Sequence, residues 1–480
     1  MLKKVLYFIF LALLILDLGY SFKQHSGQPL DGDMAGGIVP AEDLKSIFES
    51  PLGTDALIKN KIYPNPNKFF SHWMFREYFR TMPLWLQKFT NPIDSVFLSC
   101  GIAKTIIQFL IIFFLSIMIT GTKSIFKIEL LSAMLLVTPF FQTNGFHGYM
   151  SIIDPAITYT FFYALPSALL LLYFLPFIKE LYHKRHSSIN LFIKIFWIPF
   201  AAVVCLSGPL NPGIVLIFSM MVLMYNFIKN YSKSSKNNIT KKIVDSLKTI
   251  RKSYWFYLLP VIVLSFYSLY IGRFNSINII NHVPISQLYL KLPRGIYYQF
   301  THRLCFPILF AIITLNLILI KKYYYSPEGA KLIMVFKWLG IFSILYLLLL
   351  PLGGYRVYRP NILRYDTIIP ITLSLIFIFG ATTLYIIKQM KINHKILYIP
   401  LIVCILVFFT YSDKPEFNKN QCQRIALKEI AESKEQIVEL KNNCVVLSWE
   451  KVNNPEDTEF YSHLLMMWRI TNEKKLFYNK

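Results

Sequence analysis

The chain has 480 residues, of which 55% are hydrophobic and only 16% are charged, and its formal net charge is +24. Ordinary soluble domains carry about 25% charged residues, so the composition excludes that class and indicates an integral membrane protein. In a soluble chain the basic excess would suggest nucleic acid. Here the basic residues mostly flank apolar runs, so membrane topology explains them and no nucleic-acid partner is predicted.

Long apolar stretches predict an all-α polytopic membrane domain over residues 1–411. A helix needs about 20 mainly apolar residues to cross roughly 30 Å of hydrocarbon. Eleven stretches are found, at 4–20, 98–120, 128–141, 156–178, 191–206, 213–228, 254–272, 304–320, 332–350, 367–387 and 396–411. The third, fifth and sixth are short, so the predicted number of spans is eleven, give or take one or two.

The distribution of lysine and arginine predicts the topology. Lys3 and Lys4 precede the first span and favour a cytoplasmic N-terminus. Eleven crossings then place the C-terminus outside, together with loops 142–155 and 207–212, which carry no Lys or Arg. A signal peptide is the alternative for the first stretch, but no clean cleavage site follows it. We therefore expect an uncleaved anchor, and the composition fits a bacterial inner membrane.

The first outer segment, residues 21–97, opens with an acidic motif, Asp31-Gly-Asp33. Neighbouring glycines predict a turn-rich loop that presents both carboxylates at the membrane surface. There they serve as a general base or as hard oxygen ligands of a divalent cation, Mg²⁺ or Mn²⁺. A solvated turn is the usual meaning of Asp-x-Asp, but its place directly after the first span favours function. His25 is a further candidate for substrate binding.

A second feature of this segment is the aromatic stretch 67–88. It mixes many Phe, Trp and Tyr residues with Arg76, Glu77 and Arg80 and is too polar to span. The pattern predicts a helix that lies in the membrane interface, with anchorage as its first role.

Two late outer loops, 272–303 and 353–366, carry arginines against the charge rule. Guanidinium groups match phosphate oxygens geometrically, so these loops predict an anion site at the outer surface. The alternative is that the arginines reach lipid headgroups or pair with Asp366. The candidate phosphate-binding residues are Arg294, His302, Arg303, Arg356, Arg359 and Arg364.

The polar tail, residues 412–480, predicts a small α+β domain on the outer side. Helices are expected at 421–441 and 458–470, with a buried strand at 445–449. About 70 residues stabilise themselves poorly, so a Cys422–Cys444 bridge or packing on the membrane domain is expected.

The outer carboxylate loop and the set of arginines together predict a reaction on a lipid-carried phosphate substrate. If that substrate is a polyprenyl-phosphate sugar, one base and a basic clamp are sufficient for sugar transfer. The leaving phosphate needs charge neutralisation but no general acid. In an inverting displacement, Asp31 or Asp33 takes the proton of the acceptor hydroxyl while the arginines hold the developing phosphate charge. The acceptor is a lipid or a glycan, and the enzyme is a hexosyl- or pentosyltransferase.

With these features the sequence resembles the GT-C superfamily of integral membrane glycosyltransferases. The resemblance lies in one N-terminal span, a long outer loop with the acidic motif Asp31-Gly-Asp33, an interfacial aromatic helix, about a dozen spans and an outer C-terminal domain. It implies a polyprenyl-phosphate or pyrophosphate donor and gives the role of base or metal ligand to Asp31 and Asp33. Family members usually have adjacent acidic residues, whereas Gly32 intervenes here, so the identity of the base stays open.

Rival functions share some of these features. A transporter or flippase for an anionic lipid would use outer arginines, but usually shows repeats and charges at mid-membrane depth. A lipid-linked glycan polymerase or ligase would have its key outer loop late in the chain. A non-enzymatic partner subunit is the remaining alternative.

Overall fold

The computed structural model describes residues 2–40, 42–141, 146, 148–183, 191–234, 238–280, 283–355, 359 and 361–479. In these parts of the chain, nine helices are long and apolar enough to cross a membrane. The prediction of an all-α polytopic membrane protein is confirmed at this level. The nine are α1 (Leu2–Ser26), α6 (Pro92–Thr120), α8 with α9 (Ile157–His183), α11 (Asn211–Lys233), α13 (Lys252–Gly272), α16 (Cys305–Lys322), α17 (Pro327–Leu349), α18 (Ile369–Gln389) and α19 (Ile392–Ser412).

The two remaining predicted spans are also helices, but shorter ones. They are α7 (Ile128–Val137), which continues into the 3₁₀ turn Thr138–Phe141, and α10 (Leu191–Cys205). The predicted sixth span is longer than expected, because α11 has 23 residues. Every apolar stretch therefore forms a helix, while the number of full crossings stays a prediction.

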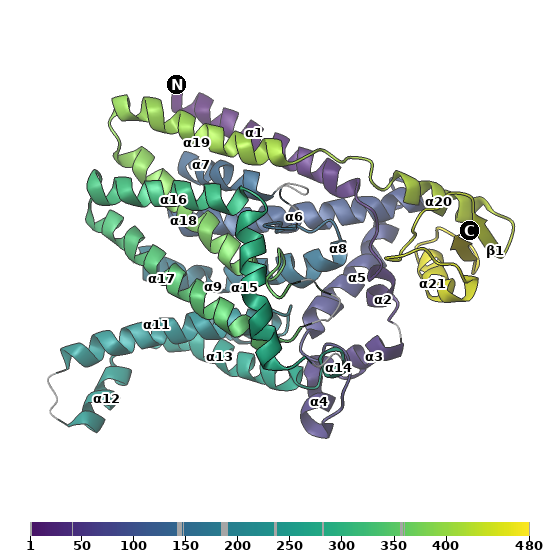
Figure 1. The fold of residues 1–480 in the computed structure, drawn as a ribbon, viewed down its shortest axis with the longest axis horizontal. Coiled ribbons are helices and arrows are strands. Elements are labelled where there is room, and N and C mark those ends of the chain that lie inside the picture. Colours follow the sequence, from purple (N-terminus) through teal and green to yellow (C-terminus); the bar gives the residue numbers. More distant parts are fainter. Residues whose placement is uncertain are drawn as a thin grey trace.

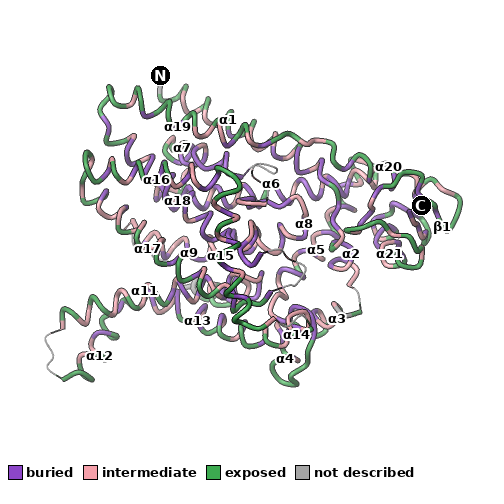
Figure 2. Tube along the Cα trace, viewed as in Figure 1, coloured by how far each residue is buried: buried purple, intermediate pink, exposed green. Residues whose placement is uncertain are grey.

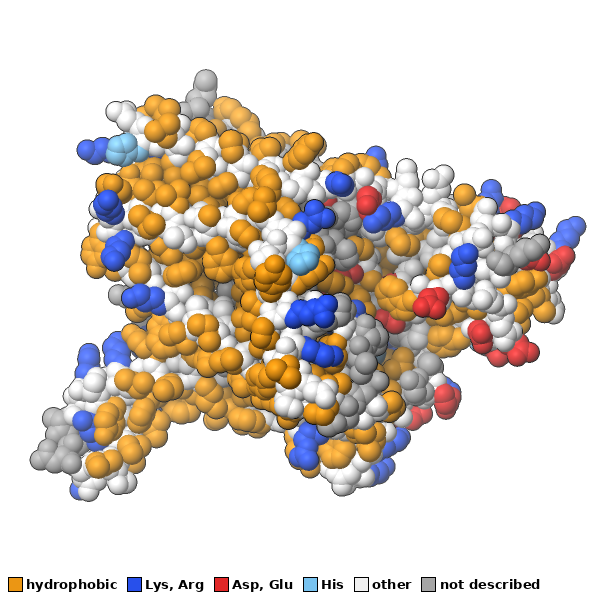
Figure 3. Space-filling model, in the orientation of Figure 1, with side chains coloured by type: hydrophobic (Ala, Val, Ile, Leu, Met, Phe, Trp, Pro, Cys, Tyr) orange, Lys and Arg blue, Asp and Glu red, His pale blue; other side chains and the backbone are white. Residues whose placement is uncertain are grey.

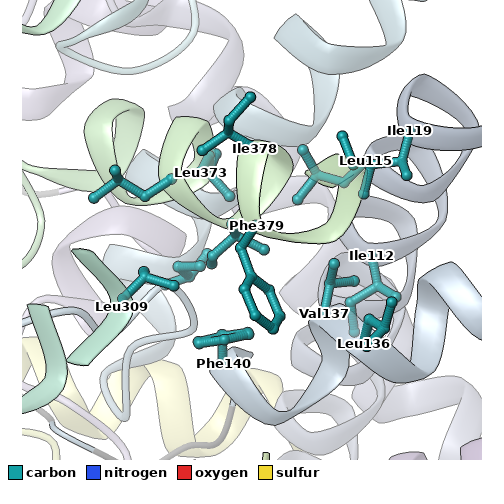
Figure 4. Close-up of a cluster of buried hydrophobic side chains, with 14 of the residues drawn as sticks. Ile112, Leu115, Ile119, Leu136, Val137, Phe140, Leu309, Leu373, Ile378 and Phe379 are labelled. Atoms are coloured by element: carbon teal, nitrogen blue, oxygen red, sulfur yellow. The ribbon is translucent and has the colours of Figure 1, made fainter. Parts of the chain in front are cut away.

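Helices α6 and α18 form the centre of the bundle, and α1, α17 and α19 lie at its edge with mostly exposed apolar faces (Figure 2). Phe379 of α18 packs on Phe140, with ring centroids 5.4 Å apart, among Ile112 and Leu115 of α6 (Figure 4). Lipid tails are as apolar as these side chains, so close packing rather than removal from water stabilises such contacts.

The bundle has two chemically different ends (Figures 1 and 3). The N-terminus and many Lys and Arg side chains lie at one end, over the connections between α11 and α12, α16 and α17, and α18 and α19. We call this the basic end. The opposite end, the loop end, carries helices α2 to α5, α14 and the C-terminal region. Predicted inner and outer segments are thus separated, although which end faces the cytoplasm stays a prediction.

Backbone hydrogen bonds join the predicted outer segments to one another. The amide of Tyr63 donates to the carbonyl of Phe274, and the amide of Ser276 donates to the carbonyl of Tyr63, both at 3.2 Å. The amide of Asn420 donates to the carbonyl of Gly27 at 2.9 Å. The first segment, a late segment and the C-terminal tail therefore meet at the loop end.

The first outer segment is mostly helical. It contains α2 (Met34–Ile38), α3 (Glu42–Glu49), the turn Pro51–Gly53, α4 (Thr54–Lys59) and α5 (Phe69–Leu86). Helix α5 is the predicted aromatic helix. Its Phe75 and Phe79 are fully buried against the protein, whereas Trp85 is exposed. The helix is therefore packed on the bundle along one face.

The late region 272–303 is also helical rather than a loop. After α12 (Ile239–Lys248) and α13, it forms α14 (Ser276–Ile280) and α15 (Ile285–Thr301). Helix α15 crosses the direction of the spans (Figure 1). Its Gly295 passes against the backbone of Leu363, where an added Cβ would lie 3.2 Å from the Leu363 amide nitrogen.

The C-terminal region contains α20 (Gln421–Glu432), β1 (Ile437–Leu440), the turn Pro455–Thr458, α21 (Glu459–Met467) and β2 (Leu476–Asn479). The two strands pair in parallel, with Ile437 opposite Leu476. The predicted strand at 445–449 is wrong, because Leu447 has a φ of 53°, which no strand accommodates. The predicted helix also ends earlier, at Glu432, and β1 follows it.

The predicted Cys422–Cys444 disulfide is present. The tail also packs on the membrane domain: its core is continuous with residues of α2, α5 and α6, and the Trp468 indole donates to the Phe79 carbonyl at 2.9 Å. Both predicted sources of stability are thus found together.

We expect Cys422→Ala combined with Cys444→Ala to destabilise this region by about 3 kcal/mol, because the bond closes a separation of 22 residues in the unfolded chain. Hydrogen exchange of amides 421–479 in the purified protein measures the change. Cys404→Ala, which replaces an exposed free thiol, is the control. Equal exchange in the double variant and the control would contradict the prediction.

Candidate functional site

Asp31 points into the protein and holds the acidic loop in place. It is 5% exposed, and its carboxylate accepts hydrogen bonds from the amide and hydroxyl of Thr158, at 3.0 and 2.7 Å, and from the amide of Asp33 at 3.1 Å. Thr158 lies in the first turn of α8, so Asp31 caps the amino end of that helix. Burial raises the pKa of Asp31 to about 6, although the bonds from Thr158 favour its charged form.

Asp33 points the other way and is exposed. Its Oδ1 accepts a hydrogen bond from Nε1 of Trp449 at 3.1 Å. The intervening Gly32 lies directly against Trp449, where an added Cβ would come within 2.6 Å of the Trp449 amide nitrogen. Gly32 thus permits the close contact with Trp449. It also separates the buried carboxylate of Asp31 from the exposed carboxylate of Asp33.

An aromatic pair links Asp33 to the late arginine loop. The rings of Trp449 and Tyr159 are stacked, with centroids 6.2 Å apart and planes at 24°. Arg359 donates a hydrogen bond to the Tyr159 hydroxyl, and its guanidinium lies 5.2 Å from the centre of that ring. Asp33, Trp449, Tyr159 and Arg359 therefore form one continuous row from four distant parts of the chain.

A second cluster brings Arg364 to the same region. Arg364 donates to Asp366 at 2.7 Å, and Asp366 interacts electrostatically with Asp154. Asp154 lies just before the helix that Asp31 caps, and its Oδ1 accepts from the Ala156 amide at 2.7 Å. Burial raises the pKa of Asp154 to about 6. Among the described residues, the buried Nη1 of Arg364 has no hydrogen-bond partner, which is unusual for a polar group.

Lys104 lies between the two clusters. It is 1% exposed within α6 and donates to the carbonyl of Pro155. Its charge interacts favourably with both Asp31 and Asp154. A buried charge inside a span marks a functional region by default. Here the lysine joins α6 to the two carboxylates at the amino end of α8.

The structure places the other candidates away from this row. His25 belongs to α1 rather than to a loop, is fully buried and makes a 2.8 Å hydrogen bond with Gln108. Arg294, His302 and Arg303 are exposed on α15 and just after it, and Arg303 interacts with Tyr149. The structure records no hydrogen bond or ion pair from these three to Asp31 or Asp33. Arg356 lies outside the described residues.

Sequence reasoning missed Lys104, Tyr159 and Trp449. Lys104 gave a signal, because it is a charged residue well inside the predicted second span. Tyr159 and Trp449 gave none, because a single aromatic residue has no periodicity and the two are brought together only by folding.

The two predicted metal ligands, Asp31 and Asp33, already have hydrogen-bond partners within the protein. Both oxygens of Asp31 already accept hydrogen bonds from the protein, and Oδ1 of Asp33 accepts one from Trp449. No group of three or more His, Cys, Asp or Glu side chains within the described ranges is placed to hold a metal ion.

Comparison with known proteins adds no further guidance: no protein-family model, curated protein or solved structure matches this chain.

The raised pKa of Asp31 predicts a pH-dependent stability. Between the ordinary value of 3.8 and about 6, the folded state binds more protons than the unfolded state, so stability falls as pH rises. Asp31→Asn does not titrate. Wild type therefore loses stability between pH 3.5 and pH 7, whereas the variant keeps its own. We expect the difference in unfolding free energy, Asp31→Asn minus wild type, to increase by up to about 3 kcal/mol over this range.

Thermal unfolding of the purified proteins across this range measures the difference. Asp457→Asn, which removes an exposed carboxylate, is the control. A constant difference between Asp31→Asn and wild type at all pH values would show that burial does not hold the proton on Asp31.

Proposed function

We propose that this protein is an inverting membrane glycosyltransferase that moves a sugar from a polyprenyl-phosphate donor to an acceptor at the loop end, on the outer face of the membrane. The observation that carries the proposal is the row from Asp33 through Trp449 and Tyr159 to Arg359. It offers a carboxylate base and a guanidinium group on either side of one aromatic pair.

The reaction divides between the two ends of the row. Asp33 accepts the proton of the acceptor hydroxyl as the oxygen attacks the anomeric carbon from the face opposite the phosphate. The bond between that carbon and the phosphate oxygen breaks, and the electron pair leaves with the polyprenyl phosphate. Arg359 and Arg364 stabilise the developing charge through charge-assisted hydrogen bonds. The phosphate is stable as an anion, so no general acid is needed.

The geometry favours Asp33 over Asp31 as the base. Asp33 is exposed, whereas the carboxylate of Asp31 is buried and committed to Thr158 and the Asp33 amide. In the proposal Asp31 positions the loop. Arg294 on α15, together with His302 and Arg303 just after that helix, forms a basic edge that first meets the donor headgroup. His25 stabilises the helix pair that supports the loop.

One observation favours the alternative of a lipid transporter or flippase. Lys104 is a buried charge within a span, as transport proteins often have. Its partner at the Pro155 carbonyl and its interactions with Asp31 and Asp154 instead fit a positioning role. The two functions differ in outcome: a transporter returns its substrate unchanged.

The test uses the purified full chain in nanodiscs with a panel of polyprenyl-phosphate-linked hexoses and pentoses as donors and simple glycosides as acceptors. Release of polyprenyl phosphate and the glycosidic product are both measured. We expect Asp33→Asn to reduce transfer about 10²–10⁴-fold, because the general base is lost. Arg359→Gln is expected to reduce it about 10²-fold, because one charge contact to the phosphate is lost.

Two exposed residues outside the row provide matched controls: Glu450→Gln for the acid and Arg80→Gln for the arginine. Both are expected to keep the wild-type rate. Full activity of Asp33→Asn would remove the base from the mechanism. Movement of intact donor across a vesicle membrane without any transfer would establish the flippase instead.

A further inference from the structure

Trp449 is exposed and yet rigidly held. It is 55% exposed, but its indole nitrogen is bonded to Asp33, Gly32 packs against its backbone and side chain, and the ring of Tyr159 lies alongside. Large aromatic side chains are usually buried, and fixed exposed ones mark binding surfaces. Cys444, which the disulfide anchors, lies five residues before Trp449 in the same segment.

We propose that the exposed indole of Trp449 is the platform on which the ring of the acceptor lies, so that the acceptor is a saccharide. The inference rests on the proposed function and adds the substrate class. A sugar ring has a face of weakly positive C–H groups and an edge of hydroxyls. The negative face of an aromatic ring attracts the C–H groups, and a carboxylate at the edge of that ring binds the hydroxyl groups.

The order of residues along the row assigns the platform to the acceptor rather than to the donor. Asp33 is bonded to the Trp449 end, whereas Arg359 is bonded to the Tyr159 end. The base must reach the acceptor hydroxyl, and the guanidinium must reach the donor phosphate. A sugar lying on Trp449 therefore presents a hydroxyl to Asp33. An acceptor that offers only a serine hydroxyl or a glycerol headgroup has no ring that could lie on the indole.

The experiment measures saturation transfer in nuclear magnetic resonance from the full chain in nanodiscs to methyl glycosides of glucose, galactose, mannose, N-acetylglucosamine and arabinose. We expect transfer to the ring C–H protons of at least one glycoside. Trp449→Ala is expected to weaken its binding about tenfold, because an aromatic contact of about 1.4 kcal/mol is lost. Trp449→Phe, which keeps an aromatic face, is expected to restore most of it.

Trp85→Ala is the matched control, because Trp85 is also exposed, at 51%, and also packs on a ring, that of Phe89, but lies on α5. It is expected to bind as the wild type does. If Trp449→Ala does not fold, Trp449→Leu removes the aromatic face with a smaller loss of volume. Absence of glycoside binding by the wild type, or equal binding by the wild type and the Ala or Leu variant, would overturn the inference.

Asp33→Asn separates this inference from the proposed function. The inference requires that the variant still bind the glycoside, because the indole face is retained. The proposed function requires that the same variant not transfer sugar. Active Asp33→Asn protein with Trp449-dependent binding would thus reject the mechanism and keep the platform.

Discussion

The hydrogen bonds from Thr158 to the carboxylate of Asp31 are the constraint on which the rest of the site depends. They join the loop after the first span to the first turn of α8, and Tyr159 is the next residue along that helix. Fixing Asp31 therefore fixes the distance between Asp33 and Tyr159, which Trp449 then bridges. A buried carboxylate costs desolvation energy, and here the helix amino end and Lys104 offset part of it.

The two aspartates have the same side chain but different roles, and the difference comes from their surroundings. Asp31 is surrounded by hydrogen-bond donors, and burial raises its pKa. Asp33 has an exposed carboxylate beside the ring of Trp449. Gly32 makes the division possible, because any side chain at this position would push Trp449 away. The glycine that interrupts the acidic motif therefore has a structural reason in this chain.

Much of the architecture could be predicted from the sequence, because it follows from one-dimensional patterns. Each apolar stretch became a helix, the aromatic stretch became α5, and the Cys422–Cys444 pair formed. The site was only partly predictable. Charge patterns pointed to Asp31, Asp33, Arg359 and Arg364, which the structure gathers. They pointed equally to Arg294, which lies on α15, and to Arg303, which follows that helix. Whether a charge reaches a site depends on contacts between distant segments, and no local pattern encodes them.

The C-terminal region is better understood as part of the site than as an appendage to the bundle. Gln423 accepts a hydrogen bond from the amide of Leu30 at 2.7 Å, and Asn420 donates to the carbonyl of Gly27. The tail thus holds the chain on the amino side of Asp31, in addition to the bonds from Thr158. The same tail supplies Trp449. The acidic loop is thus clamped between a helix of the bundle and the last segment of the chain. Trp449, which joins Asp33 to Tyr159, therefore reaches its position only when the tail has folded onto the loop end.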